Sequence, residues 1–290
     1  IFYMKIRKAI ILAAGFGTRF LPATKAQPKE MLPVVDKPIV QYLVEEAVAS
    51  GIKEIIFITG RGKGMIEDHF DHSFELEYNL VEKGKRELLK QVRQISQLAD
   101  FAYVRQPFPL GDGEAVLHAR KLINNEPVAV FFGDDIVAAK KPCLAQLMEV
   151  FEKYGDPVIA VERVAPKETF RYGIIKPIKI ESRVYQVADF VEKPKPEQAP
   201  SNLAFIGRYI ITPDLFKILE KKPHQSGEMR VADAFKEYVK IKPLYAYEFE
   251  GRRYDCGNKL GFLKATVNFG LQHKEVGREF KKYLKGLKTD

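Results

Sequence analysis

A segment near the start of the chain combines glycines with several cationic residues. Gly15 and Gly17 follow a short apolar run, and three cations come next, Arg19, Lys25 and Lys29. Glycines directly after a buried strand let backbone N–H groups approach an anion closely. Several cations together can neutralise the charge of a triphosphate before its phosphorus is attacked. The pattern predicts a triphosphate-binding loop, and a tight turn with solvent-facing basic side chains is the alternative.

Two common glycine-rich motifs do not match this segment. The dinucleotide-binding fingerprint requires a third glycine at position 20, where Phe20 stands. The Walker A motif requires Gly-Lys-Ser/Thr five residues after its first glycine, where the chain has Phe20-Leu21-Pro22. These mismatches argue against an NAD-dependent oxidoreductase and against a P-loop nucleotide-binding protein.

A pair of acids, Asp134 and Asp135, follows the apolar run 128–132. Carboxylates at the carboxyl end of a buried strand face the crevice in which open α/β sheets bind ligands. Mg²⁺ usually takes one or two such carboxylates and completes its shell with water and phosphate oxygens. Asp255 is a second candidate ligand, with a helix-start residue as the alternative interpretation. Beside the cationic loop, Asp134 is predicted to hold a metal ion.

Predicted strands and helices alternate through the first half of the chain. Strands are predicted at 9–12, 54–59, 101–104 and 128–132, and helices at 39–48, 74–95 and 115–122. The helix at 74–95 is predicted as one long element, because apolar residues recur along it at spacings of three, four and seven. Strands separated by helices indicate a mostly parallel sheet that is covered on both faces.

The second half has a different predicted order. Strands are predicted at 158–161, 173–180, 184–191 and 203–211, and helices at 213–219, 231–239 and 259–269. No long helix separates the two middle strands, which indicates an antiparallel part beside the parallel core. We find no repeat and no linker, so we expect one α/β domain.

The composition excludes several classes of protein. The 290 residues carry a net charge of +9, much of it between His273 and Lys288, where a solvated amphipathic helix is expected. Two cysteines, Cys143 and Cys256, are too few for a disulfide framework or a cysteine-based zinc site. The apolar runs are too short to cross a bilayer, and no nucleic-acid-binding signature accompanies the basic charge. We expect a soluble, cytoplasmic protein without membrane or nucleic-acid partners.

The motifs together closely resemble those of the bacterial and archaeal UTP–glucose-1-phosphate uridylyltransferases, the GalU-type group of sugar-phosphate nucleotidyltransferases. The resemblance covers roughly residues 7–284. The matching segments are 15–33, 51–52, 105–106, 133–135, 191–194, 200–204, 207–209 and 255–261. The stretch Asp-Cys-Gly-Asn-Lys-Leu-Gly at 255–261 is the most specific of them.

The resemblance implies a GT-A-like Rossmann-type fold, with a mostly parallel central sheet flanked by helices and a smaller antiparallel sugar-binding part. It implies a single nucleotidyltransferase domain over 5–290, with a nucleotide-binding half at about 5–155 and a sugar-binding half at about 156–290. The implied reaction is Mg²⁺-dependent, direct in-line transfer of a uridylyl group from UTP to glucose 1-phosphate, giving UDP-glucose and pyrophosphate. Family members assemble as dimers or tetramers, so a homo-oligomer is expected.

The same resemblance implies roles for individual residues. The nucleotide would be bound by Ala14, Gly15, Gly17, Thr18, Lys29, Gln106 and Gly111, the last two at the uracil. The sugar phosphate would be bound by Gly173, Glu192 and Lys193. The catalytic cations would be Arg19, Lys29 and Lys193, and the Mg²⁺ ligands Asp134 and Asp255.

Three residues depart from the family pattern. Asp112 and Glu114 stand where the family has an apolar residue and a histidine, and Arg230 replaces a glutamine. A carboxylate near a polyphosphate is unfavourable unless it points away, bonds the base or holds a metal. These changes leave open another nucleotide such as dTTP, or another sugar 1-phosphate. A non-catalytic paralogue that binds nucleotide sugars and a GT-A glycosyltransferase are further alternatives, although the latter would not need the triphosphate loop.

Overall fold

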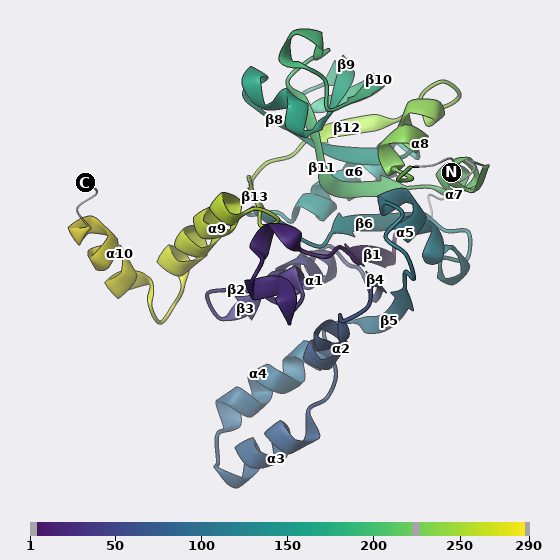
Figure 1. The fold of residues 1–290 in the computed structure, drawn as a ribbon. Coiled ribbons are helices and arrows are strands. Elements are labelled where there is room, and N and C mark those ends of the chain that lie inside the picture. Colours follow the sequence, from purple (N-terminus) through teal and green to yellow (C-terminus); the bar gives the residue numbers. More distant parts are fainter. Residues whose placement is uncertain (1–4, 222–226, 288–290) are drawn as a thin grey trace.

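The computed structural model describes residues 5–221 and 227–287. Within these residues, nine strands form one continuous sheet (Figure 1). In spatial order they are β5 (Asp100–Arg105), β4 (Glu54–Thr59), β1 (Lys8–Ala13), β6 (Val128–Phe132), β11 (Leu203–Ile211), β8 (Val158–Arg163), β12 (Tyr245–Glu248), β10 (Val184–Glu192) and β9 (Gly173–Glu181). All eight strands predicted from the sequence are confirmed, while the short β12 had no recognisable pattern.

The sheet has a parallel part and an antiparallel part. The strands β5, β4, β1 and β6 are parallel to one another, and so are β8 and β12. Strand β11 runs antiparallel to both β6 and β8, and β10 runs antiparallel to both β12 and β9. The expected parallel core with an antiparallel portion is therefore confirmed, and β11 joins the two parts into one sheet.

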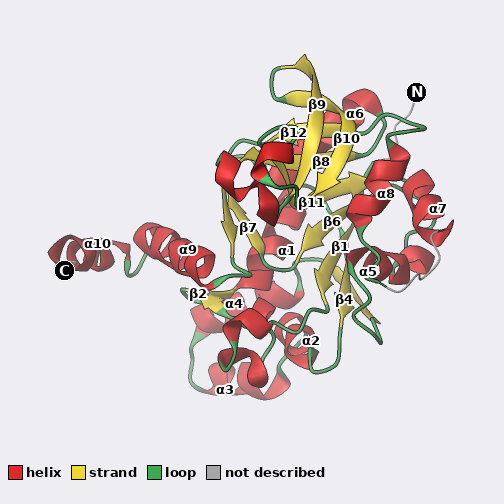
Figure 2. Ribbon diagram, turned by 45° about the horizontal axis from the view of Figure 1, so that its top comes forward, coloured by secondary structure: helices red, strands yellow, loops and turns green. Residues whose placement is uncertain are grey.

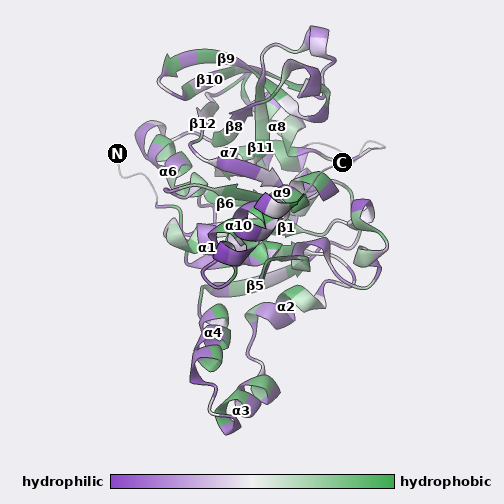
Figure 3. Ribbon diagram, turned by 90° about the vertical axis from the view of Figure 1, so that its left-hand side faces the viewer, coloured by the Kyte–Doolittle hydropathy of each residue, from purple (hydrophilic) through white to green (hydrophobic). Residues whose placement is uncertain are grey.

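Helices cover both faces of this sheet. They are α1 (Ile39–Ala49), α2 (Gly64–Phe70), α3 (Phe74–Glu82), α4 (Arg86–Ser96), α5 (Asp112–His118), α6 (Cys143–Tyr154), α7 (Pro213–Lys221), α8 (Val231–Tyr238), α9 (Lys259–Gln272) and α10 (Gly277–Gly286). Successive β1 residues point to opposite faces: Ile11 packs in the core with α1 and α6, and Ile10 in the core with α5, α7 and α8. The central strands are correspondingly hydrophobic (Figure 3).

The prediction of one long helix at 74–95 is wrong. The chain instead forms a hairpin of α3 and α4 that projects from the body (Figure 1). The helices separate at Gly84, whose φ of 63° lies in the left-handed region and ends a right-handed helix. Much of the apolar face is exposed, including Phe74 and Tyr78. The apolar period continued through the turn by coincidence of spacing, so periodicity alone did not reveal the break.

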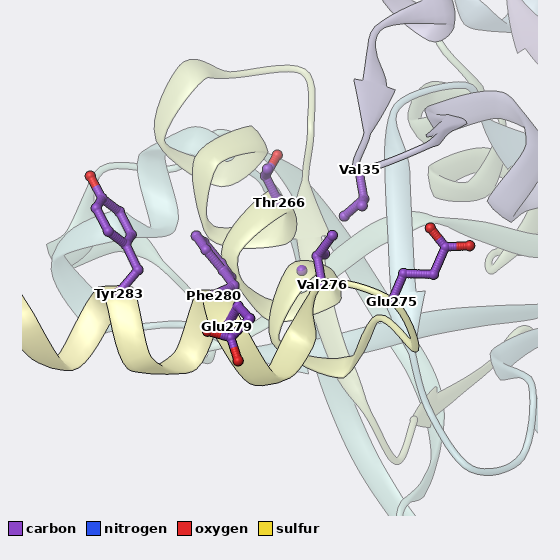
Figure 4. Close-up of a pocket in the computed structure, with 8 residues that line it drawn as sticks. Val35, Thr266, Glu275, Val276, Glu279, Phe280 and Tyr283 are labelled. Atoms are coloured by element: carbon purple, nitrogen blue, oxygen red, sulfur yellow. The ribbon is translucent and has the colours of Figure 1, made fainter.

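Helices α9 and α10 extend sideways from the body (Figures 1 and 2). Helix α10 confirms the expected basic helix, although Lys288 lies outside the described residues. A groove of about 500 Å³ lies between the two helices (Figure 4), lined by Val35, Thr266, Gly270, Glu275, Val276, Glu279, Phe280 and Tyr283. None of the predicted site residues lines this groove. No helix in the described part has the length and apolar character needed to cross a bilayer.

Two small antiparallel ladders complete the fold, one of β2 (Pro33–Val34) with β3 (Lys37–Pro38) and one of β7 (Asp135–Ala138) with β13 (Arg252–Asp255). Behind the second ladder, the fully buried Arg208 lies over the ring of Phe131 and forms an ion pair with Glu46 at 3.1 Å. Its guanidinium also donates to the backbone carbonyls of Gly207 and Asp135. Arg208 thus connects α1, β11 and the acidic loop after β6.

Replacing Arg208 with methionine leaves Glu46 as an unpaired buried charge. We expect Arg208→Met to lower the free energy of unfolding by about 3–5 kcal/mol, measured by denaturant titration. The comparison variant is Arg163→Met, which breaks an ion pair with Glu248 in which the arginine side chain is 52% exposed. We expect a much smaller loss there because solvent screens the pair. Equal losses in the two variants would contradict this interpretation of Arg208.

Candidate active site

The loop after β1 has the geometry of an anion-binding turn. Gly17 adopts φ 68° and ψ 26°, and its carbonyl accepts a hydrogen bond of 2.7 Å from Thr24 Oγ1. A Cβ atom at Gly17 would lie 3.2 Å from the Cβ of Lys29, so the turn requires glycine in both conformation and space. Gly15 and Thr18 are exposed, which leaves this backbone accessible to a ligand.

The loop after β6 lies directly beside the loop after β1. The N–H of Gly133 donates to the carbonyl of Leu12 at 2.9 Å, and a Cβ at Gly133 would lie 2.5 Å from that oxygen. This close approach places Asp134 against Lys29, and the two side chains form an ion pair. The predicted cation and the predicted metal ligand, 105 residues apart in sequence, are therefore neighbours.

The Lys29–Asp134 pair is held in its charged form. Burial by itself raises the pKa of Asp134, but Lys29, with Arg253 and Arg19, outweighs burial and the pKa is lowered. Burial by itself lowers the pKa of Lys29, but Asp134 and Glu30 outweigh it and the pKa is raised. Both directions favour an ammonium facing a carboxylate, which is the state suited to binding a phosphate and a cation side by side.

The β7–β13 ladder brings the third charged residue to the same place. Asp135 pairs with Asp255 in its register, and the N–H of Gly257 donates to Asp255 Oδ1 at 3.0 Å. A Cβ at Gly257 would lie 2.3 Å from Asp134 Oδ2 and 3.0 Å from Asp255 Oδ1, so both carboxylates reach one point. Arg19 approaches from the other side, with Nη1 3.4 Å from the carbonyl of Gly257.

Asp135 serves a different purpose from its neighbour Asp134. Its Oδ1 accepts from Arg253 at 2.9 Å, and its Oδ2 accepts from the N–H of Gly207 at 3.0 Å. Burial raises the pKa of Asp135, although Arg253 opposes that rise. The side chain is 2% exposed and directed into the protein. Of the two adjacent acids, only Asp134 points toward the loop after β1.

The donor set suits Mg²⁺ bound together with a polyphosphate. The described residues contain no group of three or more histidine, cysteine or acidic side chains that could hold a metal by themselves. Asp134 and Asp255 instead supply two converging carboxylates, and Mg²⁺ commonly takes one or two of these with waters and phosphate oxygens. The residues therefore fit the predicted ion.

Gln106 and Gly111 lie together at the end of β5. Gln106 Nε2 donates to the carbonyl of Gly111 at 3.3 Å and also to Glu114. Gly111 has a φ of 108°, and a Cβ there would lie only 2.2 Å from the carbonyl oxygen of Met229. The two predicted base-reading positions are thus in direct contact, and Gly111 tolerates no side chain.

The predicted sugar-phosphate residues gather at the β9–β10 ladder. Gly173 pairs with Glu192, and a Cβ at Gly173 would lie 3.1 Å from Glu192 Oε2. Lys193 Nζ lies 3.5 Å from Glu192 Oε1. Lys193 has a φ of 48°, an uncommon conformation for a residue with a side chain and one that is concentrated at functional sites.

The structure differs from the sequence-based expectations at Lys25, and it adds one residue, Lys63, that the sequence did not indicate. Lys25 is exposed and forms no ion pair with any described residue, whereas Lys29 pairs with Asp134 and Arg19 donates to the carbonyl of Gly257. Glu30 is fully buried and accepts from Lys63 Nζ at 2.7 Å, with its Oε1 lacking a hydrogen-bond partner among the described residues. Glu30 belongs to the matching segment 15–33, but nothing in the sequence marked Lys63.

Comparisons with known proteins agree on one family. Residues 8–270 match the family described as Nucleotidyl transferase. The chain is 54% identical over 284 residues to the UTP–glucose-1-phosphate uridylyltransferase of Bacillus subtilis (strain 168), covering 98% of this chain and 97% of that protein. It is 52% identical to the protein of the same name from Staphylococcus haemolyticus (strain JCSC1435), covering 98% and 99%.

The chain belongs to the nucleotidyl transferase family. Solved structures agree: a UDP-glucose pyrophosphorylase complexed with UDP-glucose has a TM-score of 0.85 at 43% identity, covering 93% of this chain and 100% of that one. A UTP-bound UGPase from Acinetobacter baumannii has a TM-score of 0.92 at 38% identity, covering 98% and 100%. The predicted resemblance to the uridylyltransferase group is confirmed.

Three residues depart from the pattern of the uridylyltransferase group: Asp112, Glu114 and Arg230. Each of them forms a hydrogen bond or an ion pair within the protein. Asp112 Oδ1 accepts from the N–H of Gly113 at 3.0 Å and of Val231 at 3.2 Å. Arg230 Nη1 lies 3.4 Å from Glu192 Oε1. Residues 229–231 consequently contact both the Gly111 segment and the predicted sugar side. The acid at 112 is turned toward backbone N–H groups rather than toward an open phosphate site.

Asp112 gives a prediction for stability as a function of pH. Burial raises its pKa to about 6, although backbone hydrogen bonds oppose the rise. The raised pKa means that its contribution to stability is complete below about pH 4 and is lost as the pH rises through about 6. Asp112→Asn keeps an acceptor oxygen and does not ionise. Between pH 4 and pH 7 the native chain should lose stability that Asp112→Asn keeps. We therefore expect the free energy of unfolding of Asp112→Asn minus that of the native chain to increase by on the order of 1–3 kcal/mol over this range.

Denaturant titrations of both proteins at four or five pH values over this range would test the expectation. A difference between the two proteins that stays constant with pH would show that Asp112 ionises freely in the folded protein.

Proposed function

We propose that this chain transfers a uridylyl group from UTP to glucose 1-phosphate, giving UDP-glucose and pyrophosphate. The observation that carries the proposal is the convergence of Lys29, Asp134 and Asp255 beside the Gly17 turn. Such a constellation suits a metal-bound triphosphate. Relatives at 50–54% identity over nearly the whole chain bear the name of this activity, which supports the choice of substrates.

The chemistry requires charge neutralisation and alignment rather than a general base. A phosphate monoester oxygen of glucose 1-phosphate is already largely ionised near pH 7. This oxygen attacks the α-phosphorus of UTP, the bond from that phosphorus to the α–β bridging oxygen breaks, and pyrophosphate leaves with the electron pair. No proton needs to be removed from the nucleophile. The protein must hold two mutually repelling anions in line and stabilise the leaving charge.

The residues divide between these tasks. Arg19 and Lys29 face the triphosphate and neutralise the developing pyrophosphate charge. Lys193 holds the phosphate of the attacking sugar, and Glu192 accepts hydrogen bonds from sugar hydroxyls. Bound Mg²⁺ supplies additional positive charge to the phosphate oxygens, and its proposed ligands are Asp134 and Asp255.

The remaining assignments follow the two halves of the chain. We place the nucleotide on the half at about 5–155, against Ala14, Gly15, Gly17, Thr18, Lys29, Gln106 and Gly111. We place the sugar phosphate on the half at about 156–290, against Gly173, Glu192 and Lys193. The two halves act as parts of one nucleotidyltransferase domain. A different sugar 1-phosphate is the second candidate substrate, because Arg230 contacts Glu192.

We also propose a cytoplasmic homo-oligomer, either a dimer or a tetramer. The free thiols of Cys143 and Cys256 support a reducing compartment. Exposed apolar side chains on the projecting α9 and α10, among them Leu263 and Tyr283, support self-association. Light scattering coupled to size exclusion would give the molar mass, and a monomer at micromolar concentration would contradict the assembly.

The substrate assignment can be tested by pyrophosphate release. Purified protein is supplied with Mg²⁺ and a grid of UTP, dTTP, CTP, ATP and GTP against several sugar 1-phosphates, with a parallel series in EDTA. We expect the highest rate with UTP and glucose 1-phosphate and no release in EDTA. A different best pair would identify another substrate. If folded protein releases no pyrophosphate with any substrate pair, a nucleotide-sugar-binding paralogue or a glycosyltransferase would be favoured.

Lys29→Ala should separate catalysis from binding. Removing a preorganised cation from the leaving charge is expected to reduce kcat by about a hundredfold or more. UDP-glucose, which lacks the β- and γ-phosphates of UTP that leave as pyrophosphate, should still bind, as measured by calorimetry. The matched variant Lys25→Ala removes an exposed cation of the same loop and should lose much less. A wild-type rate in Lys29→Ala would remove Lys29 from the mechanism.

A further inference from the structure

The side-chain amide of Gln106 has a defined orientation. Its Nε2 donates to the carbonyl of Gly111 and to a carboxylate oxygen of Glu114. A carbonyl oxygen and an ionised carboxylate only accept hydrogen bonds, so the NH₂ end of the amide must face both. Both N–H groups are thereby used. No described residue donates to Oε1, which leaves an acceptor as the only unused group of this amide.

Both acceptors are themselves held in place. Glu114 Oε1 lies 2.6 Å from Nε2 of His118, one turn further along α5, and the Glu114 side chain is 12% exposed. The Gly111 segment is fixed against Met229, whose N–H donates to the carbonyl of Leu110 at 2.7 Å. The amide of Gln106 cannot rotate by half a turn without placing its oxygen against these two acceptors, which would repel it.

The orientation of this amide matters because nucleobases differ at one edge. Uracil and thymine present an N3–H donor, whereas cytosine has a bare N3 acceptor. If Oε1 lies opposite N3 of the base, it pairs with the N3–H of uracil or thymine and repels the bare N3 of cytosine. A rotated amide would offer its NH₂ to cytosine instead.

We infer that Glu114 is a positioning residue that orients the Gln106 amide and so excludes cytosine nucleotides in favour of uracil and thymine nucleotides. The inference rests on the proposed function, because it requires the base to lie at Gln106. It gives a purpose to an acid that departs from the family pattern: the carboxylate acts on the reading amide and does not face the phosphates.

A purely structural role for Glu114 makes a different prediction. The residue stands in the first turn of α5, where a negative charge also favours the helix dipole. That role would change stability, and it would change the rates with all nucleotides by the same factor. Only an orienting role changes the UTP to CTP ratio while leaving the UTP to dTTP ratio intact, because thymine and uracil share the edge that Gln106 faces.

The test compares kcat/KM for UTP, dTTP and CTP in Glu114→Leu and the native chain, with Glu149→Leu on the exposed side of α6 as the matched control. We expect the UTP to CTP ratio to fall by about tenfold or more in Glu114→Leu, the scale of one mispaired buried hydrogen bond. The UTP to dTTP ratio should stay within about twofold. An unchanged UTP to CTP ratio, or an equal fall in both ratios, would overturn the inference.

Two further measurements keep the test decisive. If Glu114→Leu does not fold, Glu114→Gln replaces it. The amide introduced at position 114 would either accept from or donate to Gln106, so it would no longer fix the Gln106 orientation and the UTP to CTP ratio should again fall. An unchanged ratio overturns the inference. If the native chain shows no turnover, calorimetric binding of UTP and CTP replaces the rates. A preference lost in Glu114→Leu would then support the orienting role while the proposed reaction fails, and an unchanged preference would overturn the role.

Discussion

The charged contact between Lys29 and Asp134 is the interaction on which the rest of the site depends. Burial by itself disfavours the charge on each group. The opposite charge of the partner, together with Glu30 near Lys29 and with Arg253 and Arg19 near Asp134, outweighs that effect on both pKa values. Two glycines leave the space for this contact: a Cβ at Gly133 would collide with the backbone carbonyl of Leu12, and a Cβ at Gly257 would collide with the carboxylate of Asp134. The glycines and the ion pair are therefore parts of one arrangement, which places an ammonium beside a carboxylate next to the Gly17 turn.

The features that the sequence predicted well are those encoded within short segments. Apolar β-branched runs predicted β1 and β6, and both strands are confirmed. Gly17, Lys29 and Asp134, which follow these strands, lie close together in the structure, while their roles stay a prediction. The position of Asp255 beside Asp134 was harder to predict from the sequence. It arises from pairing between β7 and β13, two four-residue strands more than a hundred residues apart, and neither strand is long enough to show a period. The local sequence offered Asp255 only as a candidate, with a helix-start residue as the alternative, and the family resemblance favoured the metal-ligand interpretation.

Some contacts near the site could not be predicted because no sequence pattern marks the residues that form them. Lys63 is an ordinary lysine in sequence, yet it is buried against Glu30, which in turn lies beneath the charged site and contributes to the raised pKa of Lys29. The identical acids Asp134 and Asp135 likewise differ only in three dimensions. Asp134 lies in the turn that follows β6, where its side chain meets Lys29, whereas Asp135 is the first residue of β7 and its side chain meets Arg253.

The residues that depart from the family pattern act on loops rather than on phosphates. Asp112 accepts hydrogen bonds that join the segment after Gly111 to Val231, and Glu114 accepts from Gln106. A carboxylate bound to donors of the protein is directed by them, which removes the repulsion that an acid near a polyphosphate would otherwise create. In the proposed function, reaction chemistry and nucleotide choice therefore fall to different residues. The Lys29–Asp134 contact involves none of the residues 112, 114 and 230, so these positions can change while that contact is kept.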